Sequence, residues 1–226
     1  MSGATTTHQA GSTSSTGGLP LTKVGAVAGL AGPALFTAGF LVHEAVRRGE
    51  FDPVAEPVSA LEAGASGWIQ QANFVLFGLL LALFAVALHR GMAPTPRGAL
   101  GPALLGLAAF GLLLAAALPL REGASGVAYD PGGHFIAGVT FFLSSALALL
   151  VLSRRMARDA RWRSLSTYAV VCGVVAAIGF VVLGRLTMPD GAPFHEWAGL
   201  LQRALIVLVT FPCFVTLAAR LRVVTR

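Results

Sequence analysis

Three of the five histidines in this sequence stand where a long apolar run meets a polar loop: His43, His134 and His195. Neutral imidazole is a common zinc ligand, and three histidines with an open fourth position would let the metal activate water for hydrolysis. Each histidine belongs to a different run, and no local H-E-x-x-H motif is present. The histidines therefore indicate either a zinc site assembled from three segments or three separate hydrogen-bonding side chains.

Asp130 and His134 are four residues apart, a spacing that places both on one face of a helix if that helix begins early. A carboxylate in this position could fix the imidazole tautomer. The intervening Pro131-Gly-Gly makes an early helix start less favourable. Other polar residues fall at the same edge of the apolar runs and complete a candidate ligand-binding site: Glu44, Ser59, Gln70, Asn73, Glu196 and Arg203.

Arg203 lies about two turns inside the last apolar run, where an isolated cation would cost a few kcal/mol. We therefore expect it to have a carboxylate partner, for which Glu62 and Glu196 are the candidates. Gln70 and Asn73, three residues apart on one helix face, could complete a hydrogen-bonded network. The pair is either a structural link between helices or part of a ligand-recognition site.

The loop from Arg47 to Gly67 is long and punctuated by proline, which favours an ordered lid over a random linker. Within it, Glu56 and Glu62 could be acids whose pKa is raised against an apolar substrate. With Asp130 they are the candidate catalytic residues for acid-catalysed cyclisation or isomerisation. The alternative is that they are ordinary solvated carboxylates.

The composition decides what kind of scaffold positions these residues. The chain of 226 residues is 55% hydrophobic and 12% charged, against about 25% charged in soluble domains. Its net charge of +6 comes from basic residues at the ends of apolar runs, which argues against nucleic-acid binding. The sequence therefore predicts an integral membrane protein.

Six apolar runs are long enough to cross the roughly 30 Å hydrocarbon core as helices. Small residues within them should let the helices pack closely, and Pro33 and Pro212 should kink the first and last. The predicted fold is an all-α bundle of six transmembrane helices. Its helices are expected at Val24–Val42, Trp68–Leu88, Ala99–Leu118, Phe135–Leu152, Ser166–Leu183 and Trp197–Ala218.

Loop charges predict the orientation, because basic residues stay on the cytoplasmic side. One side carries eleven cations and the single acid Asp159: Lys23, Arg90, Arg97, Arg154, Arg155, Arg158, Arg161, Arg163, Arg220, Arg222 and Arg226. The other side carries five cations and nine acids. We expect both termini in the cytoplasm of a bacterial inner (plasma) membrane, with the polar cluster on the outer side.

The remaining features need no special chemistry. Residues 1–20 are rich in Ser, Thr and Gly and are expected to form a disordered cytoplasmic tail, with the transmembrane domain at 21–226. Cys172 and Cys213 lie inside apolar runs and should be small buried side chains. Trp68, Trp162 and Trp197 flank the runs and should be interface anchors at the headgroup level.

Two segments carry a resemblance to a known family. Asp52-Pro-Val-Ala-Glu-Pro-Val-Ser-Ala-Leu-Glu62, followed by Gly67-Trp-Ile-Gln-Gln-Ala-Asn-Phe74, resembles the prokaryotic multi-pass family of domain of unknown function 998. The Gly-Gly-His134-Phe opening of the fourth run is similar too, although members often have a histidine where Asp130 stands. The resemblance implies the fold and the membrane location, and no activity. A looser similarity to alkaline ceramidase and adiponectin receptor hydrolases lacks their paired H-x-x-x-H.

Two functions from different classes fit these residues. The first is an outward-facing polar pocket that binds a small or lipid-like ligand. The second is an enzyme at the outer leaflet, either a metal-dependent hydrolase or an acid-catalysed cyclase or isomerase. Partners are expected to be membrane lipids and the ligand, and zinc is the cofactor that the histidines would bind.

Overall fold

The structure, a computed structural model, describes residues 21–124, 126–187 and 191–225, so the tail expected over residues 1–20 lies outside the described residues. Six helical segments are long and apolar enough to cross a membrane, which confirms the predicted fold class. The first five are α1 (Leu21–Val46), α2 (Trp68–Gly91), α3 (Leu100–Ala117), α4 (His134–Met156) and α5 (Ser166–Thr187). The sixth runs from His195 to Val224.

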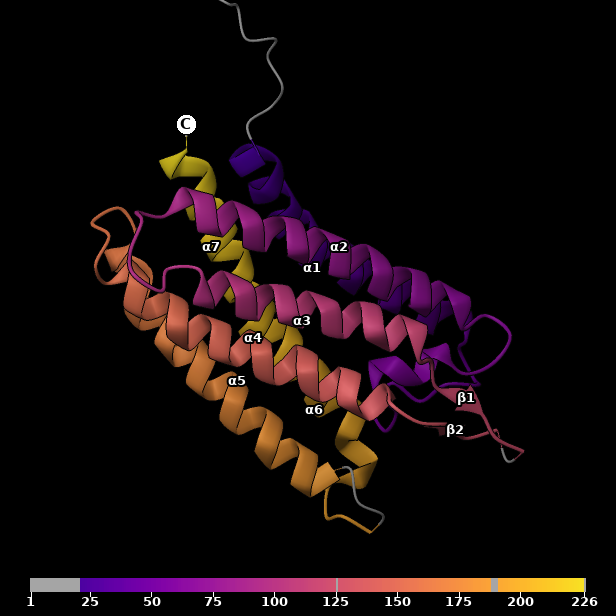
Figure 1. Ribbon diagram of the computed structural model, residues 1–226. Helices are drawn as coiled ribbons and strands as arrows, with labels where there is room; N and C mark the ends of the chain where they lie inside the picture. Colours follow the sequence, from indigo (N-terminus) through magenta and orange to yellow (C-terminus); the bar gives the residue numbers. More distant parts are fainter. Residues whose placement is uncertain (1–20, 125, 188–190, 226) are drawn as a thin grey trace, which may run out of the picture.

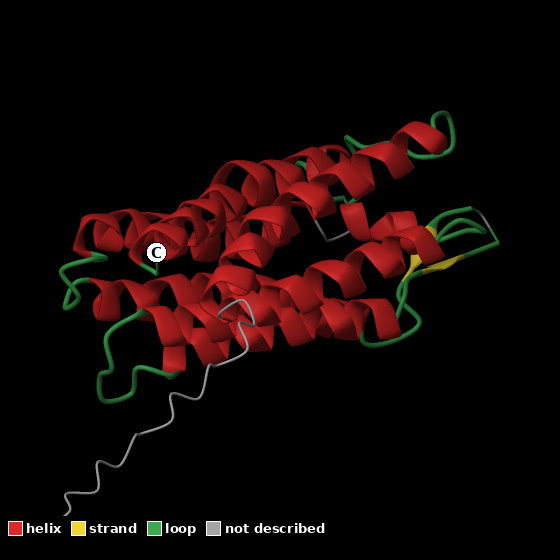
Figure 2. Ribbon diagram, turned by 90° about the horizontal axis from the view of Figure 1, so that it is seen from above, coloured by secondary structure: helices red, strands yellow, loops and turns green. Residues whose placement is uncertain are grey.

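The two ends of the bundle differ in what they carry. The start of α1 and the end of α7 (Phe211–Val224) lie at one end, which we call the terminal end (Figure 1). A short antiparallel hairpin of β1 (Arg121–Glu122) and β2 (Ala128–Tyr129) lies at the opposite, distal end (Figure 1). The helices run side by side along the axis that joins these ends (Figure 2). All of the candidate site residues belong to the distal end.

Close packing between neighbouring helices relies on small residues, as the sequence predicts. α1 packs against α2 and α7, and each of α2, α3 and α4 packs against the next helix in the chain. A Cβ atom added at Gly25 of α1 would lie 2.1 Å from the Cβ of Ala87 in α2. A side chain at Gly111 of α3 would meet the backbone nitrogen of Phe141 in α4 at 2.7 Å. Glycine is therefore what lets these backbones approach so closely.

Phenylalanine rings fill the centre of the bundle. Phe36 of α1 lies 5.0 Å from Phe77 of α2 and 5.9 Å from Phe211 of α7, measured between ring centroids. Phe77 is also 6.2 Å from Phe141 of α4. The edge-to-face arrangement of several of these pairs is the favoured one for aromatic rings. This cluster separates the polar groups of the distal end from those of the terminal end.

The sixth segment is not one continuous α-helix. It consists of a short turn η3 (His195–Trp197), α6 (Ala198–Ala204), a π-helical turn η4 (Leu205–Thr210) and α7. Pro212 lacks a backbone N–H, and its ring would clash with the carbonyl four residues earlier in a regular α-helix. The wider π-helical turn lies immediately before this proline, so the distortion expected at Pro212 takes the form of a π-helical turn.

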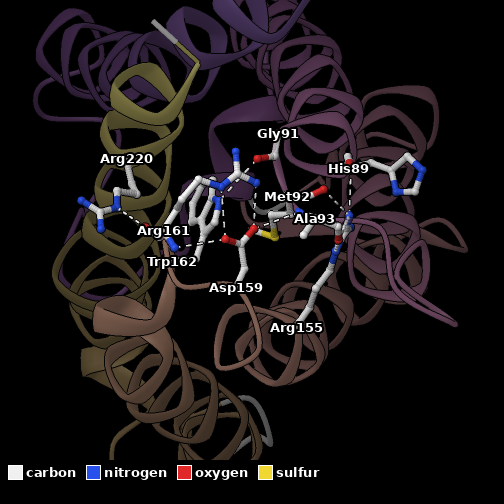
Figure 3. A network of polar contacts seen from close by, with 9 residues as sticks. All are labelled: His89, Gly91, Met92, Ala93, Arg155, Asp159, Arg161, Trp162 and Arg220. Carbon is white, nitrogen blue, oxygen red and sulfur yellow. Dashed lines mark hydrogen bonds and ion pairs between the residues drawn. The ribbon is translucent and has the colours of Figure 1, made fainter.

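At the terminal end, a buried arginine holds the end of α2 to the end of α4 (Figure 3). Arg155 is 7% exposed, and its guanidinium donates to the carbonyl oxygens of His89, Met92, Ala93 and Gly98 at 2.7–3.1 Å. The last carbonyls of a helix have no partner within the helix. Arg155 therefore supplies donors that the end of α2 and the following loop lack.

Asp159 and Trp162 complete this terminal network (Figure 3). Asp159 accepts hydrogen bonds from the Ala93 N–H at 2.9 Å and from the Arg161 guanidinium at 2.9 and 3.2 Å. The hydrogen bond from Arg161 is the main reason why the pKa of Asp159 is lowered to about 2. Trp162 is fully buried and donates to the Gly91 carbonyl at 3.4 Å. The prediction that Trp162 is an interface anchor is therefore wrong, because its indole packs inside the network.

We expect Arg155→Met to lower the free energy of unfolding by about 3 kcal/mol, because four backbone carbonyls lose a charged donor. The measurement is thermal unfolding in detergent. Arg154→Met is the matched control, since Arg154 is the exposed neighbour on the same turn. Equal melting temperatures for the two variants would contradict the proposed role of Arg155.

Candidate functional site

The loop between α1 and α2 is folded onto the distal end rather than extended from it. It contains the 3-10 helix η1 (Val58–Glu62). Three of its own side chains, those of Phe51, Val58 and Leu61, are buried against the bundle. The N–H groups of Gly199 and Leu200 donate to the carbonyls of Ala55 and Val54 at 3.2 and 2.9 Å. The loop therefore pairs with the start of α6, as expected of an ordered lid.

Arg203 joins this loop to α1. Its Nε and Nη2 donate to one carboxylate oxygen of Glu44, at 2.9 and 2.6 Å, and its Nη1 donates to the carbonyl of Glu56 at 2.8 Å. The guanidinium also lies over the rings of Phe40 and Phe51, 5.9 and 5.7 Å from their centroids. Attraction to the aromatic faces compensates part of the desolvation of the cation.

The expected partners of Arg203 were wrong. Glu44 of α1 forms the ion pair, whereas Glu62 binds elsewhere and Glu196 makes no salt bridge within the described residues. Both side chains of the observed pair are about one-tenth exposed, at 10% and 11%. Gln202, next to Arg203, accepts a hydrogen bond from the Val58 N–H at 3.0 Å. These contacts favour a structural role, in which Arg203 fixes the loop to the bundle.

Glu62 and His134 form a second pair, which is more deeply buried. The side chain of Glu62 has no exposed surface, and its Oε2 lies 3.2 Å from Nδ1 of His134. Oε2 also accepts a hydrogen bond from the Leu120 N–H at 3.3 Å, and Nδ1 of His134 lies 3.0 Å from the Leu118 carbonyl. A carbonyl oxygen only accepts, so the proton of the imidazole belongs on Nδ1. The end of α3 thus orients both side chains.

The environment of Glu62 favours its neutral form. Burial raises its pKa from 4.5 to about 8, and the hydrogen bond from the Leu120 N–H offsets part of this effect. At neutral pH the contact with His134 is therefore made by a protonated carboxylic acid. Glu62 is an unusual loop residue, because a carboxyl group that stays protonated at neutral pH can both donate a hydrogen bond and release a proton.

Asp130 caps α4 instead of orienting the imidazole. One of its oxygens accepts from the N–H groups of Gly132 and His134 at 2.8 and 3.2 Å, and the other accepts from Phe135 at 2.9 Å. Although burial acts in the opposite direction, these backbone hydrogen bonds lower the pKa of Asp130. The expectation that Asp130 fixes the tautomer of His134 is wrong, since the Leu118 carbonyl does so.

Three buried polar atoms at the distal end have no hydrogen-bond partner among the described residues: His43 Nδ1, Glu62 Oε1 and Gln70 Nε2. The other ring nitrogen of His43 lies 3.0 Å from the Ser66 hydroxyl. Gln70 is fully buried, and its Oε1 accepts from Asn73, which also donates to the Phe36 carbonyl at 3.0 Å. The predicted pairing of Gln70 with Asn73 is confirmed, and the amide nitrogen of Gln70 remains free.

The three histidines do not assemble a metal site. Within residues 21–124, 126–187 and 191–225, no three His, Cys, Asp or Glu side chains are grouped as a metal ion would require. His43 contacts Ser66, His134 contacts Glu62 and Leu118, and His195 lies 2.8 Å from the Thr187 carbonyl. The proposed zinc site of His43, His134 and His195 is therefore corrected to three separate hydrogen-bonding side chains.

The other candidate residues lie around the two pairs. Glu56 is half-buried and accepts from the Asp52 N–H at 3.1 Å, which ties it into the loop. Ser59 is half-buried within η1, and Glu196 is exposed in η3. Glu56, Ser59 and Glu196 therefore lie nearer the surface, whereas Glu62, Gln70 and His43 are buried.

The comparisons with known proteins agree with this architecture. The profile of a family described as a protein of unknown function (DUF998) matches residues 30–219, which run from within α1 to within α7 and include the loop and both buried pairs. The chain belongs to this family. No curated protein and no solved structure matches it. The protein is thus a multi-pass membrane protein of an uncharacterised family.

The sequence pattern does not reveal several groups that position the side chains of the candidate site. The carbonyl of Leu118 and the N–H of Leu120 belong to main-chain groups after α3, which no side-chain pattern reveals. Gly67 also has a specific role, because a Cβ there would lie 1.8 Å from the Glu62 carbonyl oxygen. Glycine at this position lets η1 pack against the first turn of α2. The only sequence feature that points to this role is the position of Gly67 directly before Trp68, where α2 begins.

We expect Arg203→Met to cost about 3 kcal/mol of unfolding free energy, because Glu44 and the Glu56 carbonyl lose a buried partner. Adding Glu44→Leu should recover part of this loss, since the unpaired carboxylate is then gone. Thermal or denaturant unfolding in detergent measures both effects. Arg185→Met serves as the control, because Arg185 is an exposed arginine at the same end; a cost no larger than the control's would refute the structural role.

Because the pKa of Glu62 is raised to about 8, the folded state binds its proton more tightly than the unfolded state, whose pKa is near 4.5. Stability from this group is complete below the unfolded value and declines as the pH rises towards 8. Melting temperatures measured from about pH 5 to about pH 9 should therefore fall more steeply for the native protein than for Glu62→Gln. The exposed Glu122→Gln variant should retain the native slope.

Infrared spectroscopy detects the protonated carboxyl group of Glu62 directly. Above about pH 6, where ordinary carboxyl groups are ionised, a protonated carboxylic acid band should remain in the native protein. This band should disappear as the pH passes about 8, and it should be missing in Glu62→Gln over the same range. The absence of such a band from the native protein between about pH 6 and about pH 8 would show that Glu62 is ionised at neutral pH.

Proposed function

We propose that the distal end binds a small or lipid-like molecule through a hydroxyl or carbonyl head group, beneath the loop between α1 and α2. The observation that carries this proposal is the set of three unpartnered buried atoms on His43, Glu62 and Gln70. Each buried polar group without a partner costs about 1–3 kcal/mol. Three such groups at one end of a small bundle are better explained by a bound partner than by chance.

The three groups lie along neighbouring segments. Ser66, the partner of His43, precedes α2 by two residues, and the Glu62 carbonyl abuts Gly67. The N–H of Gln70 in turn donates to the Gly67 carbonyl at 3.1 Å. The end of α1, η1 and the first turn of α2 therefore supply all three unpartnered atoms.

The chemistry of these atoms selects the ligand class. The amide nitrogen of Gln70 donates, and Glu62, when protonated, can donate from the oxygen that does not receive the Leu120 N–H. Two donors require an oxygen acceptor, and a hydroxyl group can in addition donate to Nδ1 of His43. A neutral alcohol head group satisfies all three, whereas an ester carbonyl satisfies only the two donors. The phenylalanines beneath favour an apolar tail.

The charge distribution supports an assignment to the outer side of a bacterial inner membrane. The basic residues gather at the terminal end, and by the positive-inside rule that end faces the cytoplasm. The ligand would then reach the site from the outer leaflet or the periplasmic side.

A second function, acid catalysis, is favoured by one observation. Glu62 holds a proton at neutral pH beside an imidazole whose Nδ1 is engaged by Leu118. Such an acid could protonate an apolar substrate in a cyclisation or isomerisation. Of the candidate catalytic residues, Asp130 is committed to capping α4, so Glu62 is the residue that this function would use.

The experiment is a thermal-shift assay of the purified protein with monooleoylglycerol, oleyl alcohol and, as a tail without a head group, hexadecane. The first two probes should stabilise the native protein, by about 2.7 kcal/mol at a hundred times the dissociation constant. Gln70→Leu should abolish the shift, whereas Gln71→Leu, a change at the half-buried neighbour, should keep it.

The outcomes separate the alternatives. If no probe shifts the native protein and Gln70→Leu raises its melting temperature, then the amide is an unpaired group and the binding proposal fails. Mass spectrometry of the recovered probes tests catalysis, because an isomerised product that Glu62→Gln does not form would establish the enzymatic function.

A further inference from the structure

A groove at the terminal end lies far from the distal site and has a different chemistry. It is lined by Ser164, Leu165, Thr216, Ala219, Arg220 and Val223 and has a volume of about 260 Å³. Ser164 and Leu165 belong to the turn η2 (Arg163–Leu165) before α5, and the other four residues belong to α7. The groove therefore runs between η2, which immediately precedes α5, and one face of α7.

The groove lies where the membrane-spanning segments end. The fifth apolar segment begins at Arg163 and the sixth ends at Val224, so the lining residues lie at the boundary between the hydrocarbon and the headgroups. Helix α5 is also the least covered helix, since 22% of its most apolar stretch is buried, against 44–50% in the other five segments. A lipid lying against α5 can thus reach the groove from the bilayer.

Arg220 gives the groove a positive charge that no carboxylate of the described residues neutralises. Its Nε donates to the Arg161 carbonyl at 2.6 Å, and its Nη2 lies 3.5 Å from the Ser164 hydroxyl. Among the described residues it has no carboxylate within 4.0 Å. Asp159, the acid of this end, is already paired with Arg161 (Figure 3). The guanidinium is therefore held in place by two contacts and remains available to an external anion.

The surroundings increase this positive potential. The terminal end also carries exposed arginines at the ends of the helices and in the loop before α5: Arg90, Arg97, Arg154, Arg158, Arg161, Arg163 and Arg222. Because basic clusters at this level attract anionic lipids, the charge complements a phosphate at the membrane surface. Leu165, Ala219 and Val223 add an apolar wall for the glycerol and the start of an acyl chain.

We propose that this groove is a binding site for an anionic phospholipid, with the headgroup phosphate on Arg220 and Ser164 and an acyl chain along α5 and α7. The planar guanidinium can donate two parallel hydrogen bonds to phosphate oxygens, and the Ser164 hydroxyl can add a third. The bound lipid fills the gap between α5 and α7 at their loop ends and so links the least covered helix to the bundle.

The test is native mass spectrometry of the full chain after equilibration with an equimolar mixture of phosphatidylglycerol and phosphatidylcholine. The native protein should retain phosphatidylglycerol preferentially. Arg220→Gln should lower the retained fraction by about fivefold to tenfold, since one charged phosphate contact is lost. Arg222→Gln is the matched control, because Arg222 is an exposed arginine of the same helix outside the groove, and it should retain the native fraction.

A second variant and a phosphate control test the proposal independently of Arg220→Gln. Ala219→Trp leaves every charge in place but fills the groove, and it should reduce phosphatidylglycerol retention as Arg220→Gln does, even if the latter folds poorly. Inorganic phosphate alone should neither stabilise the protein nor displace the lipid, because it has no acyl chain. The proposal is overturned if the two lipids are retained equally, if Arg222→Gln loses as much as Arg220→Gln, if Ala219→Trp retains the native fraction, or if phosphate alone displaces the lipid.

Discussion

The desolvation of polar groups is the constraint on which the rest of this structure depends. In a bilayer, a buried cation or an unpaired carbonyl has to find its partner within the protein. Arg155 at the terminal end and Arg203 at the distal end meet this requirement in related ways, because each donates to backbone carbonyls of a connecting loop. Both arginines thereby convert an irregular segment, whose own hydrogen bonds are incomplete, into a fixed part of the bundle.

The two ends nevertheless differ in how completely their polar groups are satisfied. At the terminal end, Arg155, Asp159 and Trp162 all have partners, and none of their buried polar atoms is left without one among the described residues. At the distal end, Arg203 is paired with Glu44, whereas Glu62 and Gln70 each keep one atom without a partner among the described residues. A structural role explains the first pattern fully, whereas the second combines a rigid frame with free hydrogen-bonding capacity.

The length of the apolar runs was sufficient to predict the scaffold, because hydropathy reports directly on bilayer-spanning length. Every predicted run overlaps an observed helical segment, but several helices extend further, as α7 does to Val224 against the predicted Ala218. The ordered loop follows from its proline spacing. The partners of individual polar side chains could not be predicted from the sequence in the same way. Arg203 pairs with Glu44 because α1 closes the bundle against the sixth segment, and Trp162 is buried because α2 ends beside it. Such contacts depend on which helices become neighbours, and a local pattern does not specify this.

The state of Glu62 follows from the same distinction between local pattern and tertiary contact. Its sequence context resembles that of Glu56, which stays half-buried and bonded within its own loop. Glu62 differs because η1 turns it inward, where Gly67 allows close packing and the end of α3 supplies the Leu120 N–H. One backbone hydrogen bond cannot offset full desolvation of a carboxylate, so the neutral acid is the stable form at neutral pH. A bundle that needed only a stable core could have an apolar residue at this position. The proton and the free oxygen of this buried acid beside His134 are therefore the groups that the proposed binding or catalysis would use.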